Sequence, residues 1–233
     1  MKQVWDKYCS TGFSYANKLD QQEFAQFAKN IKRLYGQLLP QDKTANILDV
    51  GCGAGHFLYY LQQEGYTNYY GIDISSEQVE FCKAYVTEKV ELADVFEFLK
   101  DKIQRYDSIV ANDLIEHIPR EYILEFLNLS YQALRLGGVI ILKTGNMSAP
   151  GALSLRYIDF THETGFTERS LAQVLRLANF KKVKVLPTPY TKKVAVPYAI
   201  LHAGVRFLYR IFGAGCPECL TSLIVGIGTR IEE

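Results

Sequence analysis

Asp49-Val50-Gly51-Cys52-Gly53-Ala54-Gly55 carries the strongest local signal in the chain. The stretch ends a short apolar run, residues 46–50, and precedes residues 57–63, whose apolar positions have helical spacing. A strand that passes through closely spaced glycines into a helix needs those glycines, because the turn is tight and a ligand must approach bare backbone amides. The stretch therefore predicts a strand, a glycine loop and a helix that together bind a small polar ligand.

Strand and helix patterns alternate on the C-terminal side of this loop. Apolar runs at residues 69–73, 106–111 and 139–142 predict strands. Apolar residues recur at helical spacing over 77–86 and 122–134, and Gly137-Gly138 is expected to end the second of these helices. The alternation predicts an α/β fold, a parallel sheet with helices on both faces that binds ligands at the carboxyl ends of its strands.

The two ends of the chain extend this plan. Residues 180–186 alternate like a half-exposed strand and residues 221–228 form a glycine-flanked apolar strand, so the two are expected to pair antiparallel. Residues 19–39 predict an amphipathic helix that packs over the ligand end or an edge of the sheet. We divide the chain into an N-terminal helical cap, 1–44, and a main domain, 45–233, in which 187–220 form a basic amphipathic insertion.

Composition narrows the function classes. The chain has 233 residues, of which 48% are hydrophobic and 22% are charged, as in globular proteins. Its formal net charge is +1, so we expect no nucleic-acid partner held by a bulk electrostatic field. The charged start Met1 to Lys7 does not resemble a signal peptide, and no charge-free run reaches the roughly 18 residues that span a bilayer. A cytoplasmic protein is expected.

The acids near the glycine loop indicate which ligand it binds. In a dinucleotide-binding loop the third glycine comes three residues after the second, whereas here the gap is two. Asp49 suits a ligand with a positive amino group, and Asp73, at the end of the next strand, is placed to accept hydrogen bonds from two ribose hydroxyls. These details argue against a nicotinamide dinucleotide.

Five segments in this order resemble the motifs of class I S-adenosylmethionine-dependent methyltransferases: 49–55, 71–75, 93–95, 112–117 and 136–139. The resemblance implies S-adenosylmethionine as the cofactor and a Rossmann-like, doubly wound seven-stranded sheet whose last strand is antiparallel. It also implies that Asp94 bonds the adenine amino group, that Val95 offers its backbone amide and that Ile74 lines the adenine pocket. The expected cofactor-binding residues are Asp49, Gly51, Cys52, Gly53, Gly55, Asp73, Ile74, Asp94, Val95 and Asn112.

Histidines and acids after the fourth strand are the candidates for chemistry. Glu116, His117 and His162 are the expected catalytic residues, and Asp113, Glu116, His117 and His162 could hold Mg²⁺ or Mn²⁺. The set is similar to the Glu-x-x-Glu-His and later His of metal-dependent small-RNA 2′-O-methyltransferases, with Asp113 in place of the first Glu, and to a stretch in ubiquinone-biosynthesis O-methyltransferases. A histidine base without metal and a purely structural role are the alternatives.

The acceptor is the most open part of the prediction. Residues 156–163 resemble a block in methyltransferases encoded with bacterial polysaccharide genes, which favours O-methylation of a glycan or another small hydroxylated molecule. An RNA 2′-O-methyltransferase and a non-catalytic S-adenosylmethionine-binding protein are the alternatives. Residues 197–212 predict a basic amphipathic helix that caps the acceptor, lies on a membrane surface, or packs on the core or on a second subunit.

Overall fold

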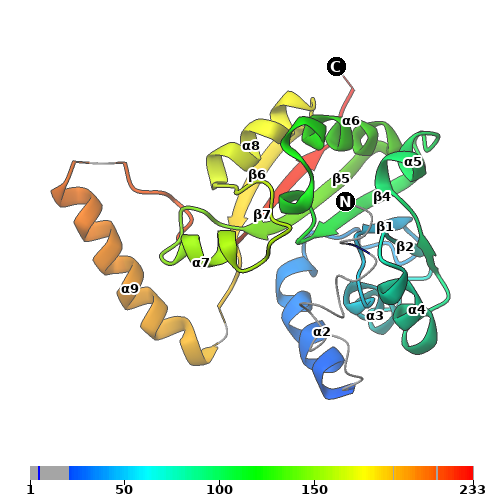
Figure 1. Cartoon of the computed structure of the whole chain (residues 1–233), viewed down its shortest axis with the longest axis horizontal. Coiled ribbons are helices and arrows are strands. Elements are labelled where there is room, and N and C mark those ends of the chain that lie inside the picture. The colour runs from blue at the N-terminus through cyan, green and yellow to red at the C-terminus, as the bar shows by residue number, and fades with distance from the viewer. Residues whose placement is uncertain (1–4, 6–20, 191, 214, 233) are drawn as a thin grey trace.

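A single seven-stranded sheet forms the centre of the protein (Figure 1). The computed structural model describes residue 5 and residues 21–190, 192–213 and 215–232. The strands are β1 (Ile47–Val50), β2 (Tyr69–Asp73), β3 (Val90–Leu92), β4 (Tyr106–Asn112), β5 (Leu134–Gly145), β6 (Lys181–Pro187) and β7 (Leu223–Thr229).

The strand order is β3-β2-β1-β4-β5-β7-β6. β1 to β5 pair in parallel, whereas β7 runs antiparallel to both of its neighbours, β5 and β6. This is the predicted doubly wound sheet with an antiparallel last strand, so the predicted fold class is confirmed.

Helices cover both faces of the sheet (Figure 1). They are α2 (Gln21–Tyr35), α3 (His56–Gln63), α4 (Ser76–Tyr85), α5 (Val95–Leu99), α6 (Ile123–Ala133), α7 (Ala152–Tyr157), α8 (Glu168–Leu177) and α9 (Lys192–Ile211), with short 3-10 turns η2 (Ile115–His117) and η3 (Arg120–Tyr122). None of these helices is long and apolar enough to cross a membrane.

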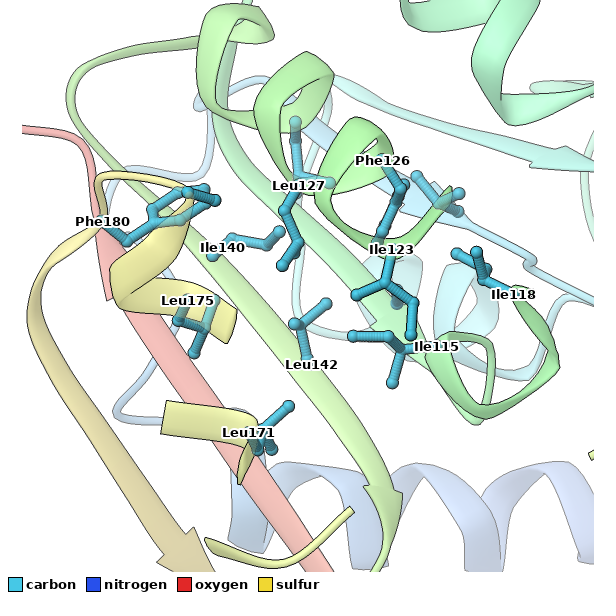
Figure 2. Packing of buried hydrophobic residues seen from close by; sticks show 14 of the residues in the cluster. Ile115, Ile118, Ile123, Phe126, Leu127, Ile140, Leu142, Leu171, Leu175 and Phe180 are labelled. Atoms are coloured by element: carbon cyan, nitrogen blue, oxygen red, sulfur yellow. The ribbon is translucent and has the colours of Figure 1, made fainter. Parts of the chain in front are cut away.

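Alternate residues of the central strands supply two separate hydrophobic cores. Ile140 and Leu142 of β5 pack with α6 and α8, as Figure 2 shows, where Phe126 and Leu175 reach into the same cluster. Ile141, between them, belongs to the other cluster, with residues of α2, α3 and α4. Because both faces of a strand are buried, its sequence is a continuous apolar run, and this is why the central strands could be predicted.

Several elements differ from the prediction, and the differences in α6, β3 and α9 have physical reasons. α6 ends at Ala133, before Gly137-Gly138, because β5 already begins at Leu134. Gly137 lies within this strand, and its N–H donates a hydrogen bond to Arg230 O. β3 is a short edge strand that the sequence did not reveal. α9 begins at Lys192 and not at Pro197, which lies one turn inside the helix, where it costs one backbone hydrogen bond.

Candidate functional site

A cavity of about 920 Å³ opens at the carboxyl ends of β1, β2 and β4. This is the edge at which a doubly wound sheet binds ligands. Six of the predicted cofactor-binding residues line the cavity: Gly51, Gly53, Asp73, Ile74, Asp94 and Val95. His117 and Asp113 line it as well, so the candidate chemistry lies beside the cofactor loop.

The glycine loop needs its glycines for backbone reasons. Gly51 and Gly53 have φ values of +68° and +53°, which residues other than glycine adopt only at an energetic cost. A Cβ on Gly51 would also lie 2.9 Å from Leu114 Cδ1. Gly55 does not line the cavity, and a Cβ there would lie 2.5 Å from Cys82 Sγ, so this glycine is required where the start of α3 packs on α4.

Asp73 holds the loop and lines the cavity at the same time. Its Oδ2 accepts a hydrogen bond from Gly53 N at 2.8 Å, and its Oδ1 accepts one from Ser75 N at 2.8 Å. Burial raises the pKa of this carboxyl, and these backbone amides oppose the shift. The carboxylate thus sets the position of the Gly53 amide, and each oxygen keeps a further lone pair for a ligand.

Asp49 is a buried carboxylate close to the loop. Neither of its oxygens has a hydrogen-bond partner among the residues that the structure describes. Burial, and then the charge of Asp73, raises the pKa of Asp49 well above its usual value, while Lys143 opposes that shift. A buried polar group without a partner is costly, so a cationic ligand group nearby would be stabilised.

Three other predicted residues have structural contacts of their own. Cys52 is buried outside the cavity lining and would meet a Cβ added to Gly71. Asn112 Oδ1 accepts a hydrogen bond from Tyr35 OH, which joins α2 to the end of β4. Asp94 Oδ1 accepts a hydrogen bond from Phe96 N and caps α5, so it is both a helix cap and a cavity residue.

Backbone hydrogen bonds bring the two predicted histidines together. Glu163 N and Thr164 N donate to Glu116 O at 2.7 and 3.1 Å, which joins the loop after α7 to η2. The rings of His117 and His162 then lie 4.8 Å apart between centroids. The prediction that a later loop brings His162 to the end of β4 agrees with this geometry.

The hydrogen bonds of the two rings fix their tautomers. Thr161 Oγ1 donates to Asp159 Oδ1 at 2.7 Å, so this hydroxyl accepts from His117 Nδ1 at 2.8 Å. His162 Nδ1 faces Leu155 O, which only accepts, at 3.1 Å. In its neutral form, each ring therefore carries the proton on Nδ1 and the lone pair on Nε2.

The structure groups the metal-ligand candidates differently from the prediction. Asp113 Oδ2 pairs with Lys143 Nζ at 2.5 Å, and Glu116 Oε2 accepts from Thr144 Oγ1 at 2.9 Å. Burial, and then Asp113, raises the pKa of Glu116 to about 7. Among the residues that the structure describes, possible metal-binding atoms of His117, Asp159 and His162 lie within 4.8 Å of one another.

Sequence reasoning assigned no role to Asp159, Thr161 or Trp5. Asp159 and Thr161 position His117, but only the folded loop shows which of its polar side chains point inward. The Trp5 ring lies edge-on to His117, 5.7 Å between centroids, and lines the cavity. No sequence pattern links a tryptophan so near the N-terminus to a histidine after the fourth strand.

Known proteins resemble the chain in sequence and in structure. A model of the methyltransferase domain matches residues 19–185. The uncharacterized protein RP028 of Rickettsia prowazekii (strain Madrid E) is 27% identical over 112 residues, which span 44% of this chain and 44% of that protein.

Two solved structures have the same fold. A SAM-dependent methyltransferase from Archaeoglobus fulgidus superposes with a TM-score of 0.66 at 24% identity, over 87% of this chain and 94% of that one. A possible histamine N-methyltransferase from Thermotoga maritima has a TM-score of 0.66 at 14% identity, over 99% and 100% of the two chains. The chain therefore belongs to the methyltransferase domain family and has the class I fold of S-adenosylmethionine-dependent methyltransferases.

Proposed function

We propose that the protein transfers a methyl group from S-adenosylmethionine to a hydroxyl oxygen of a small molecule or glycan. Hydrogen bonds join His117, which lines the cavity, to Thr161 and Thr161 to Asp159. This arrangement is the observation that supports an oxygen acceptor. A hydroxyl group must lose its proton as it attacks, so its methylation calls for a base or a metal at this place.

The residues around the cavity fit the cofactor. When bound, S-adenosylmethionine supplies a sulfonium methyl group for in-line displacement. Asp73 would accept hydrogen bonds from the ribose hydroxyls with its remaining lone pairs. The amino group would favour the ionised form of the buried Asp49 carboxyl and pair with it. Ile74, which lines the cavity, and the amide of Val95 would meet the adenine ring. The open backbone at Gly53, where a Cβ would meet only Gln78 Oε1 at 3.9 Å, leaves room for close approach.

His117 acts as the general base in this proposal. Burial, and then the neighbouring His162, lowers the pKa of His117, which favours the neutral ring with an available lone pair on Nε2. Nε2 would take the hydroxyl proton while the acceptor oxygen bonds the methyl carbon. The bond from that carbon to the sulfonium sulfur would break, leaving its electron pair on S-adenosylhomocysteine. The ring becomes an imidazolium, whose Nδ1–H the Thr161–Asp159 pair holds in place, and it then releases the proton to solvent.

A divalent metal is the second candidate at the same place. The observation in its favour is the clustering of ligand atoms from His117, Asp159 and His162. Two imidazoles and one carboxylate suit Mn²⁺ or Fe²⁺ better than Mg²⁺, which prefers an all-oxygen shell. A metal here would lower the pKa of the acceptor hydroxyl and take over the role of the base.

Methyl-labelled S-adenosylmethionine tests the proposal with four probe acceptors: catechol, a methyl glycoside, histamine and a short single-stranded RNA. We expect label on catechol or the glycoside. Transfer to histamine would contradict the oxygen acceptor, and transfer to RNA would contradict the small-molecule acceptor. Binding of S-adenosylhomocysteine without transfer to any probe would favour a non-catalytic binding protein.

The same assay separates the base from the metal. We expect Thr161→Val to lower transfer by about tenfold to a hundredfold, because the ring loses its acceptor at Nδ1. If His117 acts without metal, EDTA leaves transfer unchanged. If EDTA abolishes transfer and Mn²⁺ restores it, the metal-assisted reaction is supported, and elemental analysis should find the metal bound.

A further inference from the structure

Helix α9 leaves most of its apolar side chains outside the protein. Figure 1 shows the helix, in orange, standing apart from the sheet. Val196, Ile200 and Phe207 are 68%, 69% and 61% exposed. A row of large exposed apolar side chains marks an interaction surface, because it gains little from folding alone.

The exposed side chains share one side of the helix. At about 100° per residue, Val196, Ile200, Phe207 and Ile211 fall within an arc of about 60°. Leu201, Leu208 and Phe212, which are also exposed, continue this surface. We call these seven residues the α9 apolar face.

The opposite side of α9 faces the rest of the chain. Tyr198, His202, Val205 and Tyr209 are the less exposed positions of the helix, and they share one stripe. Tyr190 stacks on Tyr198, 4.1 Å between ring centroids, and its ring also lies 5.7 Å from that of His202. These contacts orient the α9 apolar face away from the protein.

The charge around α9 is one-sided. Between Glu168 and Glu218 the sequence contains nine Lys and Arg residues and no Asp or Glu. The whole chain has 26 basic and 25 acidic residues, so 17 basic and 25 acidic residues remain elsewhere. Arg206 and Arg210, both exposed, lie on α9 beside its apolar face. The segment therefore combines exposed apolar groups with local positive charge.

This combination favours an anionic bilayer over a second copy of the chain. In a two-fold symmetric dimer the same basic segment would meet itself, and like charges would repel. An anionic lipid surface instead complements the charge, and an amphipathic helix that lies in its interface buries the apolar side chains. α9 is not long and apolar enough to cross the membrane, so it would lie along the surface.

A second exposed apolar segment lies next to the candidate site. Leu153 and Tyr157 of α7, with Ile158 and Phe160 after it, are 74–95% exposed. Phe160 lies between Asp159 and Thr161, which point inward to His117. A bilayer that contacts Phe160 would therefore lie close to His117, the proposed base.

We infer that the α9 apolar face and its arginines dock the protein on anionic phospholipid bilayers. The inference does not depend on the acceptor atom, and it predicts that an acceptor carried by a lipid reaches the site from the membrane surface.

Vesicle flotation of the full chain tests this docking. We expect binding to vesicles of phosphatidylcholine with phosphatidylglycerol, weak binding to phosphatidylcholine alone, and release by salt. The double variant Ile200→Asp/Phe207→Asp should weaken binding about tenfold or more. Arg206→Gln/Arg210→Gln should also weaken binding, but only to the anionic vesicles.

Ile103→Asp is the matched control, because Ile103 is 65% exposed in a loop outside α7 and α9. This variant should bind vesicles like the wild type, and all variants should bind S-adenosylhomocysteine unchanged, which shows that they fold. Equal binding to both vesicle types, or equal loss in Ile103→Asp, would overturn the inference. A dimer in light scattering that Ile200→Asp/Phe207→Asp disrupts, without vesicle binding by the wild type, would assign the face to a second copy instead.

Discussion

The cofactor edge is built in the opposite way from helices α7 and α9. At the cofactor edge, short turns follow buried strands, and backbone amides at Gly53 and Ser75 fix the Asp73 carboxylate. In α7, the loop after it and α9, apolar side chains such as Phe160 and Phe207 lie outside, and Thr161 of the loop is held by its hydrogen bond to Asp159. The contrast teaches that cofactor binding and acceptor handling rest on separate structural supports, so mutations should separate them.

His117→Ala should give the largest effect. We expect turnover to fall about 10²–10⁴-fold, because the variant lacks the proposed general base, while S-adenosylhomocysteine affinity changes little. Transfer assays and calorimetry on the same preparation measure the two quantities. His202→Ala, on the half-buried side of α9, is the control and should keep turnover. Equal loss of affinity and turnover in His117→Ala would break the separation.

Phe126→Ala should destabilise the fold by about 3–5 kcal/mol, because Phe126 is fully buried in the cluster of Figure 2. Urea denaturation measures the change in the free energy of unfolding. A change below about 1 kcal/mol would mean that the α6 core does not pack as described.

Asp73→Ala should weaken S-adenosylhomocysteine binding by about 2–3 kcal/mol, since two charge-assisted hydrogen bonds are lost and the Gly53 amide loses its partner. Calorimetry measures the change in affinity, and Asp101→Ala, at an exposed residue, is the control. Unchanged affinity would remove Asp73 from the cofactor site.

Leu208→Ala should change the free energy of unfolding by no more than about 0.5 kcal/mol, because Leu208 is 53% exposed. Urea denaturation without lipid checks this smallest effect. A loss comparable to that of Phe126→Ala would mean that α9 is part of the core in solution.

The sequence predicted best the central strands, which are buried on both faces. β2 has the bounds that the apolar run at 69–73 indicated, and β1 and β4 differ by a residue at one end. These strands are buried on both faces, so their composition alone reveals them. β3 escaped prediction because only Val90 of its three residues is buried.

The site was predictable where its residues sit at strand ends. Gly51, Gly53 and Asp73 line the cavity because each ends a parallel strand or lies within three residues of its end. The pairing of His117 with Thr161 and Asp159 depends on a loop held by two backbone hydrogen bonds to Glu116 O, and no periodicity encodes such bonds. The predicted metal set included His162 but not Asp159 for the same reason, since only the folded loop brings the Asp159 carboxylate close to His117.

The antiparallel pairing of β6 with β7 makes α9 exchangeable. The two strands are neighbours, and Thr188 N donates to Leu223 O, so the points where the chain leaves and rejoins the sheet are close together. The return segment is anchored by Asn146, whose side-chain amide donates to Cys219 O and Thr221 O. Because loop length costs little free energy, the chain between these anchors can be shortened or replaced without rebuilding the sheet.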